Sequence, residues 1–344
     1  DMWSVKICNE LFNSYKFLGK FFITVDGNLD PVMLEKYNSY IKNLKDFLGD
    51  YLSEDDEDCN YIPKNLPGKV EGEKHSLQEY LNKLNKLIGL EKVKKDVNSL
   101  INLVQIRKLR QDWGIKQPSM SLHLVFSGNP GTGKTTVARL LSKIYHEIGL
   151  LSKGHLIETD RSGLVGGYVG QTAIKTRDVV DQAMGGILFI DEAYSLASTS
   201  ENDYGKEAIN TILKSMEDNR DDLIVIVAGY PELMDRFLHS NPGLESRFNK
   251  FIYFDDYNAE ELYDIFKLMC DEANLVLEKS SEDYAIQYFD KMCENKPQNF
   301  ANGRVVRNFF EEVITAQANR LVLQEDITDE ELNTLTYEDF LVED

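Results

Sequence analysis

SGNPGTGKTT, at residues 127–136, decides the fold of this chain through its own residues and through what flanks it. The apolar run HLVF precedes it and the helix-forming run VARLLSKIYHEIG follows it, an order that predicts a strand, a glycine loop and a helix. Gly128, Gly133, Lys134 and Thr135 fit the pattern G-x-x-x-x-G-K-[ST] of a phosphate-binding loop, the Walker A motif. In such a loop, backbone N–H groups surround phosphate oxygens, the lysine reaches the β- and γ-phosphates, and the hydroxyl ligates magnesium.

An ordinary glycine-rich turn between a strand and a helix has a similar composition. The flanking strand and helix stand in the correct order, however, and this favours the phosphate loop. The residues expected to bind the nucleotide are Gly128, Asn129, Pro130, Gly131, Thr132, Gly133, Lys134, Thr135 and Thr136.

The length and composition of the chain limit its class. With 344 residues it exceeds the usual size of a single hydrophobic core, so we expect two or three compact units. The longest apolar run, LIVIVAG, is far too short to cross a bilayer. The four cysteines are dispersed without metal-binding spacing, which favours reduced thiols in a cytoplasmic protein. The formal net charge of -20 argues against a nucleic-acid partner and against a surface that coats nucleic acid.

Strand-like and helical segments alternate through the middle of the sequence. The strand-like segments are residues 123–126, 155–159, 187–190, 223–228 and 251–254. This alternation predicts an α/β fold of the P-loop NTPase type, with a parallel sheet covered by helices on both faces. From Asn258 onward no comparable strand stands out, and the capping box NAEE predicts the first helix of a helical lid domain.

Four segments follow from these patterns. Residues 1–52 have apolar positions at helical spacing and form a predicted small helical N-terminal domain of unknown role. Residues 53–75 are acidic and contain proline and glycine, which predicts a linker. The α/β ATPase domain is predicted at residues 76–256 and the helical lid at 257–344.

The α/β domain is expected to begin with two helices. A capping box at residues 76–79 predicts a helix that stops near Gly89, and a second helix is expected from about Glu91 to Asp112. The break between them, LIGLEKVK, precedes the phosphate loop by a few dozen residues. Periodicity leaves two interpretations of this break open, a segment that folds over a nucleotide base and a plain helix–helix turn.

The segment ILFIDEA predicts acidic groups beside the bound phosphates. It places Asp191 and Glu192 at the carboxyl end of a buried strand, the edge of an open α/β sheet where ligands bind. Asp191 is expected to hold magnesium, and Glu192 to polarise the attacking water, as in a Walker B motif. Taken alone, the motif also fits an acidic strand end that is simply solvated.

The order of these motifs resembles that of the AAA+ ATPases, and within them the CbxX/CfxQ group, which includes stage V sporulation protein K and the red-type Rubisco activases. The resemblance covers roughly two thirds of the chain and is carried by GNPGTGKTTVAR, LVGGYVGQT, GGILFIDEAYSL, VIVAGYPELMDRF, NPGLESRF and NGRVVRN. It implies ATP and Mg²⁺ as cofactors and a homo-oligomeric ring, usually a hexamer. It also implies hydrolysis at subunit interfaces and a chaperone-like pull on a protein substrate through a central pore.

The resemblance also implies roles for single residues. Arg247 resembles the arginine finger that a neighbouring subunit projects onto the γ-phosphate, although alone it reads as a surface charge. Arg304 resembles the sensor that reports the phosphate state to the lid, with Arg307 as its competitor. Tyr168, in the glycine-rich loop at 163–172, resembles a pore-loop aromatic; its alternative is a glycine turn with the ring packed against neighbours.

One position departs from the wider family. Many AAA+ proteins end the fourth strand with Asn or Thr, whereas this chain has Ala228, Gly229 and Tyr230. Tyr230 either positions water through its hydroxyl or caps the helix that begins at Pro231, and both interpretations stay open.

The leading hypothesis is a ring-forming ATPase that remodels a protein target. A nucleotide-gated scaffold that recruits a partner through the N-terminal domain is the alternative, and a DNA-handling motor is disfavoured by the acidic charge. The sequence names no target and does not assign Rubisco activation.

Overall fold

The computed structural model describes residues 39–42, 44, 73–115, 120–168, 170–197, 204–324 and 326–341. The chain divides into two compact units, Asp1–Glu71 and Gly72–Asp344. Apart from a short helical segment at 39–42 and 44 and the helix that begins at Glu73, the predicted N-terminal domain and linker lie outside the described residues. The description below concerns the second unit.

Five parallel strands form the central sheet, in the order β2-β3-β4-β1-β5. The strands are β1 Leu124–Gly128, β2 Leu156–Thr159, β3 Ile187–Ile190, β4 Ile224–Gly229 and β5 Lys250–Phe254. Strands β3 and β4 are buried along their whole length, which explains why their sequences are continuous apolar runs. The predicted parallel sheet is confirmed.

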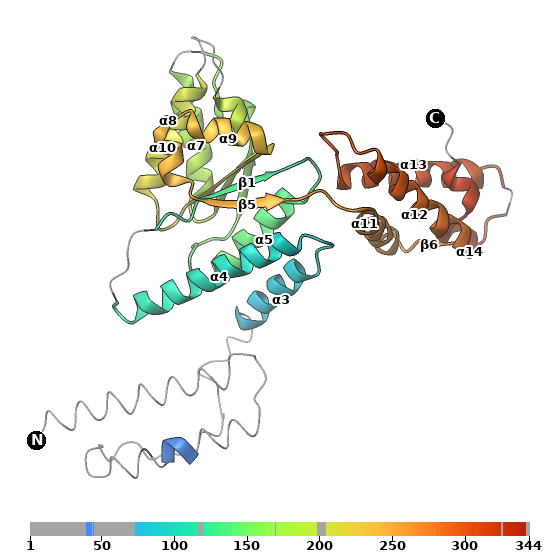
Figure 1. The fold of residues 1–344 in the computed structure, drawn as a ribbon, viewed down its shortest axis with the longest axis horizontal. Coiled ribbons are helices and arrows are strands. Elements are labelled where there is room, and N and C mark those ends of the chain that lie inside the picture. Colours follow the sequence, from blue (N-terminus) through green and yellow to red (C-terminus); the bar gives the residue numbers. More distant parts are fainter. Residues whose placement is uncertain are drawn as a thin grey trace, which may run out of the picture. The chain divides into compact units, whose positions relative to one another are not determined.

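Helices cover both faces of this sheet (Figure 1). On one face lie α3 Glu73–Asn85, α4 Glu91–Asp112 and α5 Lys134–Glu147; on the other lie α7 Gln171–Ala183, α8 Gly205–Asp218 and α9 Pro231–His239. Side chains alternate along each strand, so Phe126 packs with the first group and Val125 with the second. Three short elements complete the domain: α6 Arg161–Leu164, the 3-10 turn η2 Ala193–Leu196, and α10 Pro242–Arg247.

The two helices at the start of the domain match the prediction except at the ends of α3. Helix α4 spans the predicted residues, but α3 begins at Glu73, one turn before the capping box that was expected to open it, and ends at Asn85, about one turn before Gly89. Glu and Lys are good helix formers, so the helix continues through that signal. The turn between the helices contains Gly89 at φ +58, and a Cβ there would overlap the Glu261 carboxylate.

The predicted helical lid is confirmed and has its own aromatic core. Its helices are α11 Ala259–Glu272, α12 Lys279–Glu294, α13 Gly303–Leu321 and α14 Asp329–Asn333, with a 3-10 turn η3 at Tyr337–Phe340. The phenylalanines that pack together inside the lid are Phe266, Phe289, Phe309 and Phe340. The predicted capping box at Asn258 and Glu261 is present, with both hydrogen bonds made. Two-residue strands, β6 Val276–Leu277 and β7 Thr334–Leu335, also pair; strands this short leave no periodic pattern.

An ion pair with a buried carboxylate fixes the end of the lid. Asp339 is 1% exposed and accepts two hydrogen bonds from Arg320, Nε to Oδ1 at 2.7 Å and Nη2 to Oδ2 at 2.9 Å. It also accepts a hydrogen bond from the backbone N–H of Thr336 at 2.9 Å.

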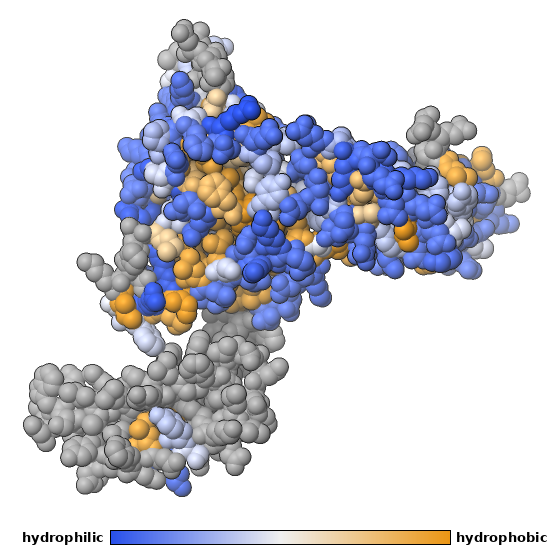
Figure 2. Space-filling view, viewed as in Figure 1, coloured by the Kyte–Doolittle hydropathy of each residue, from blue (hydrophilic) through white to orange (hydrophobic). Residues whose placement is uncertain are grey.

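The surface of the lid visible in Figure 2 is mostly hydrophilic, with scattered apolar residues. Among the described residues, no helix is both long and apolar enough to cross a membrane.

Candidate functional site

The phosphate loop joins the end of β1 to the start of α5. Gly131 and Gly133 have φ values of 70 and 90, a left-handed conformation that glycine adopts without strain. A Cβ on Gly131 would overlap the carbonyl oxygen of Ala301 in the lid, so only glycine fits there. No side chain of the described residues caps α5, which leaves the N–H groups of its first turn for an anion.

A cavity of about 880 Å³ lies against this loop and gathers most of the predicted site residues. Those that line it are Gly128, Pro130, Gly131, Gly133, Lys134, Thr135, Thr136, Asp191, Glu192 and Arg304. Arg307, the alternative to Arg304, lines it as well. Asn129 and Thr132 do not. Asn129 donates to the Asp256 carboxylate instead, and the buried Thr132 hydroxyl donates to the Asn129 carbonyl at 2.8 Å.

Lys134 is held against the loop itself. Its Nζ donates to the carbonyl oxygens of Gly128 at 2.9 Å and Asn129 at 2.8 Å. Burial lowers the pKa of Lys134 to about 8; Asp191 opposes this shift, and the nearby positive charge of Arg304 adds to it. The ammonium is therefore poorly solvated until an anion enters the cavity.

The two acidic residues follow β3 directly. The backbone N–H of Asp191 donates to the Thr159 carbonyl at 2.8 Å, which fixes the strand end, and its Oδ1 accepts the N–H of Glu192 at 3.0 Å. Glu192 has φ 47, a left-handed conformation that is uncommon for a residue other than glycine. The exposed Glu192 side chain also lines a second cavity of about 420 Å³, with Arg161 and Ser195.

The turn between α3 and α4 contributes apolar residues to the main cavity. Leu87, Ile88 and Leu90 line it together with Ile265 and Met269 from α11. An apolar wall opposite a phosphate loop is the surface that a nucleotide base requires. Of the two interpretations left open by periodicity, this placement favours the segment that covers a base.

Sequence reasoning missed a group of residues between the loop and the lid. Tyr257 is 7% exposed and lines the cavity, its hydroxyl lies 3.4 Å from the Thr132 carbonyl, and burial raises its pKa to about 12. Asp256 and the buried Asn302 lie beside it. The Asn302-Gly303 dipeptide is a recognisable turn signal, but nothing in it predicts contact with the phosphate loop.

Two predicted residues lie apart from the cavity in the part of the chain that the structure describes. Arg247 ends α10, and its Nη2 lies 3.4 Å from Oε2 of Glu217 on α8. Tyr168 is 75% exposed, which contradicts the interpretation that its ring packs against neighbours. Tyr230 does line the cavity, and its side chain makes no capping bond to α9.

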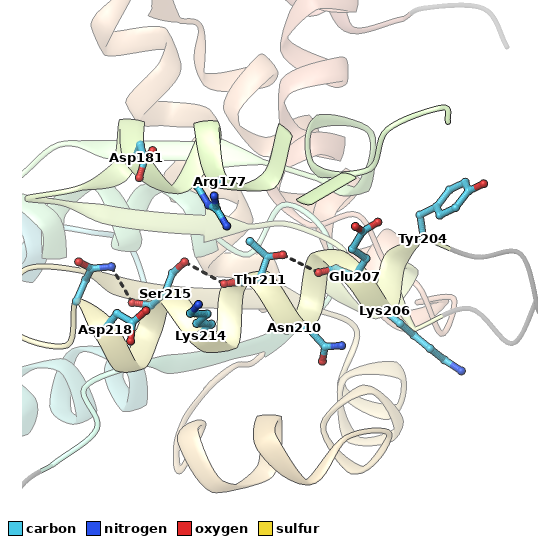
Figure 3. Close-up of a pocket in the computed structure, with 11 residues that line it drawn as sticks. Arg177, Asp181, Tyr204, Lys206, Glu207, Asn210, Thr211, Lys214, Ser215 and Asp218 are labelled. Atoms are coloured by element: carbon cyan, nitrogen blue, oxygen red, sulfur yellow. Dashed lines mark hydrogen bonds between the residues drawn. The ribbon is translucent and has the colours of Figure 1, made fainter. Parts of the chain in front are cut away.

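Another polar groove, of about 830 Å³, lies between α7 and α8 (Figure 3). Arg177 and Asp181 of α7 line it, as do Thr211 and Ser215 of α8. The two hydroxyls donate to backbone carbonyls one turn earlier in their own helix, at 2.8 and 2.9 Å. None of the predicted site residues is among the described residues that line it.

Comparisons with known proteins identify the family of the chain. The "ATPase family associated with various cellular activities (AAA)" matches residues 124–256, and the AAA lid domain matches residues 258–344. Stage V sporulation protein K of Bacillus subtilis is 44% identical over 277 residues, covering 80% of this chain and 86% of that protein. Protein CbbX of Cereibacter sphaeroides is 43% identical over 266 residues, 77% of this chain and 85% of its own length.

A chloroplastic ribulose bisphosphate carboxylase/oxygenase activase of Cyanidioschyzon merolae is 43% identical over 277 residues, 79% of this chain and 94% of that protein. Among solved structures, the FIGL-1 AAA domain superimposes with a TM-score of 0.53 at 18% identity, over 74% of this chain and 80% of that one, a likeness of fold alone. The chain therefore belongs to the AAA ATPases, enzymes that bind and hydrolyse ATP, and within them to the group of stage V sporulation protein K, CbbX and the CfxQ homologues.

Proposed function

We propose that this chain assembles into a ring, hydrolyses ATP where neighbouring copies meet, and uses the cycle to remodel a protein target. One observation carries this proposal: the cavity that contains Lys134 and Glu192 is not lined by Arg247 of the same chain. Arg304 and Arg307 of the same chain already line that cavity, so Arg247 is a further cation at the transferring phosphate, supplied by a neighbouring copy as an arginine finger. The ring is expected to be a hexamer, following the resemblance of the sequence to its family.

The residues around the cavity divide the chemistry among them. The loop N–H groups and Lys134 hold the phosphates, and Glu192 orients and deprotonates the attacking water. Thr135 and Asp191 would hold Mg²⁺, because a hydroxyl and a carboxylate oxygen that line one cavity are the hard donors this ion prefers. When bound, Mg²⁺ neutralises charge on the β- and γ-phosphates. Arg304, at the start of α13, reports the phosphate state to the lid.

A path of hydrogen bonds supports coupling between hydrolysis and the loop that presents Tyr168. The turn η2 directly follows Glu192 and contains Ser195. The Ser195 carbonyl accepts a hydrogen bond from Nη1 of Arg161 at 2.7 Å. Arg161 begins α6, and Nζ of Lys175 on α7 donates to the carbonyl of Ser162 inside α6 and to that of Val165 just beyond it. A shift of the Glu192 backbone is thus passed to the base of the glycine-rich loop.

The target is proposed to be a protein, in the cytoplasm. Two features support a protein target: one relative is named as an activase of an enzyme, and the exposed Tyr168 ring offers an apolar contact for a polypeptide. The charge of -20 disfavours a nucleic-acid target.

Mixing two inactive variants tests the shared site. Glu192→Gln removes the base and Arg247→Ala removes the finger, and each is expected to lower the ATP hydrolysis rate at least about 100-fold. In a randomly mixed ring, about one interface in four joins an intact cavity to an intact finger, so hydrolysis should return to roughly a quarter of the wild-type rate.

A matched control distinguishes this rescue from nonspecific recovery. Glu192→Gln mixed with Lys134→Ala should stay inactive, because both changes lie in the same half of the site and no interface has an intact cavity. Native mass spectrometry confirms that the rings are mixed. Full activity of Arg247→Ala alone, or mixed rings that remain inactive with intact cavities and fingers present, would contradict the shared site.

A further inference from the structure

Asn302 is buried at the junction of the lid and the phosphate loop. Its side chain is 0% exposed, and its backbone has φ 46 and ψ -124, an uncommon conformation for a residue other than glycine. Its Nδ2 lies 2.7 Å from Oδ1 of Asp256, 2.9 Å from the Phe300 carbonyl and 3.3 Å from the Pro130 carbonyl. Its Oδ1 accepts the N–H of Tyr257 at 2.9 Å. Because an amide has two N–H donors, the two shorter contacts are full hydrogen bonds and the third is the weakest.

The phosphate loop reaches the same carboxylate from the other side. Nδ2 of Asn129 lies 3.0 and 3.1 Å from the two carboxylate oxygens of Asp256 and 3.2 Å from the Gln298 carbonyl of the lid. The backbone N–H of Gly303 donates to the Gly131 carbonyl at 3.1 Å. One carboxylate therefore joins an amide of the loop to an amide of the lid, and the backbones touch beside it.

Arg304 follows this junction directly. Helix α13 begins at Gly303, so the direction of its first turn, and with it the place of the Arg304 side chain, is set by the backbone of Asn302. The hydrogen bonds of the buried amide offset the cost of that strained backbone conformation. Arg304 lines the cavity, and the junction at Asn302 holds its backbone in place there.

We infer that Asn302 is a positioning residue, which with Asp256 holds Arg304 over the terminal phosphate and so sets the preference of the site for ATP over ADP. This inference rests on the proposed role of Arg304. A single carboxylate between two amides aligns the loop residues that surround the phosphates with the arginine that senses them.

Binding measurements on single and double variants test this. The ratio of the ADP Kd to the Kd of the non-hydrolysable analogue AMP-PNP is measured by calorimetry. Arg304→Ala should lower this ratio about 10- to 100-fold, the effect of losing one charge-assisted hydrogen bond. Asn302→Gly removes the amide without adding backbone strain, and should lower the ratio at least about threefold while ADP affinity changes little. The double variant should fall no further than Arg304→Ala, since both changes remove one contact.

Asn333→Gly is the matched control, because this exposed lid amide also donates to a backbone carbonyl, that of Asp329, and should leave the ratio unchanged. Thermal unfolding shows whether each variant is folded. If Asn302→Gly does not fold, Asp256→Ala replaces it in this test. The Asp256 side chain is exposed, and its loss removes the carboxylate that bridges Asn302 and Asn129.

The outcomes separate two failures. If Arg304→Ala leaves the ratio unchanged, the proposed role of Arg304 is wrong, and the inference with it. If Arg304→Ala lowers the ratio but the junction variant matches the wild type, or if the two losses add in the double variant, Asn302 does not position Arg304 and the inference alone is overturned.

Discussion

Raising the pH above 8 is expected to weaken nucleotide binding, because Lys134 then loses its proton. Burial is the main cause that lowers the pKa of Lys134 to about 8 in the free protein. Bound phosphates raise that pKa, since they favour the charged form. A group whose pKa rises on binding contributes affinity that is fully present at a pH below its pKa in the free protein, here about 8. That affinity is lost as the pH rises toward the pKa of the same group in the nucleotide-bound protein.

The size of the effect follows from the protonated fraction of the free lysine. With a pKa of about 8, this fraction falls from about nine tenths at pH 7 to about one tenth at pH 9. The Kd for ATP should therefore rise about tenfold over this interval, equivalent to ~1.4 kcal/mol. Between pH 6.5 and pH 7 the Kd should hardly change, because Lys134 is charged in both states.

Fluorescence titration with a labelled ATP analogue, from pH 6.5 to 9.5 at constant ionic strength, measures this profile. Lys83→Met is the matched control: Lys83 lines the same cavity, but its carboxylate partner Glu79 raises its pKa, so its removal should leave the step in place. Lys134→Met should bind weakly at every pH without a step. A flat profile between pH 7 and 9 in the wild type, or a step that persists in Lys134→Met, would refute the reasoning.

Two further predictions concern the exposed loop and the lid. Tyr168→Ala is expected to abolish the acceleration of ATP hydrolysis by a permanently unfolded polypeptide, and Tyr168→Phe to retain it; a nucleotide-gated scaffold would show no acceleration and no difference between the two variants. Arg320→Ala leaves the carboxylate of Asp339 buried without its cation, so the free energy of unfolding in urea should fall by about 3–5 kcal/mol. A loss below about 1 kcal/mol would show that this carboxylate is not buried in solution.

The sheet and the cavity were predictable because their signals are local. Each buried strand is a continuous apolar run, and the carboxyl ends of parallel strands share one edge. The glycines, Lys134 and Asp191 could therefore be brought together from their positions in the sequence alone. Helix α4 was placed correctly for the same reason, since apolar spacing and the preceding Gly89 both mark its start.

What could not be predicted depends on contacts between distant segments. The carboxylate of Asp256 joins Asn129 to Asn302, and no periodicity or spacing connects these three positions. Arg247 was identified from its resemblance to a finger, but its approach to Glu217 depends on how α8 and α10 pack. The start of α3 was misplaced because a capping sequence competes with good helix formers on both sides, and local propensity does not decide between them.

The place of Tyr257 has a consequence for the pace of the cycle. It is the one residue between the matched ATPase segment and the matched lid segment, and its ring is packed in the lid core beside Leu90 and Gly133. A lid that swung away from the loop would carry this ring with it and break its contacts with Leu90 and Gly133. A smaller residue at position 257 is therefore expected to weaken the hold of the lid on the loop and to shorten the time for which spent ADP stays bound.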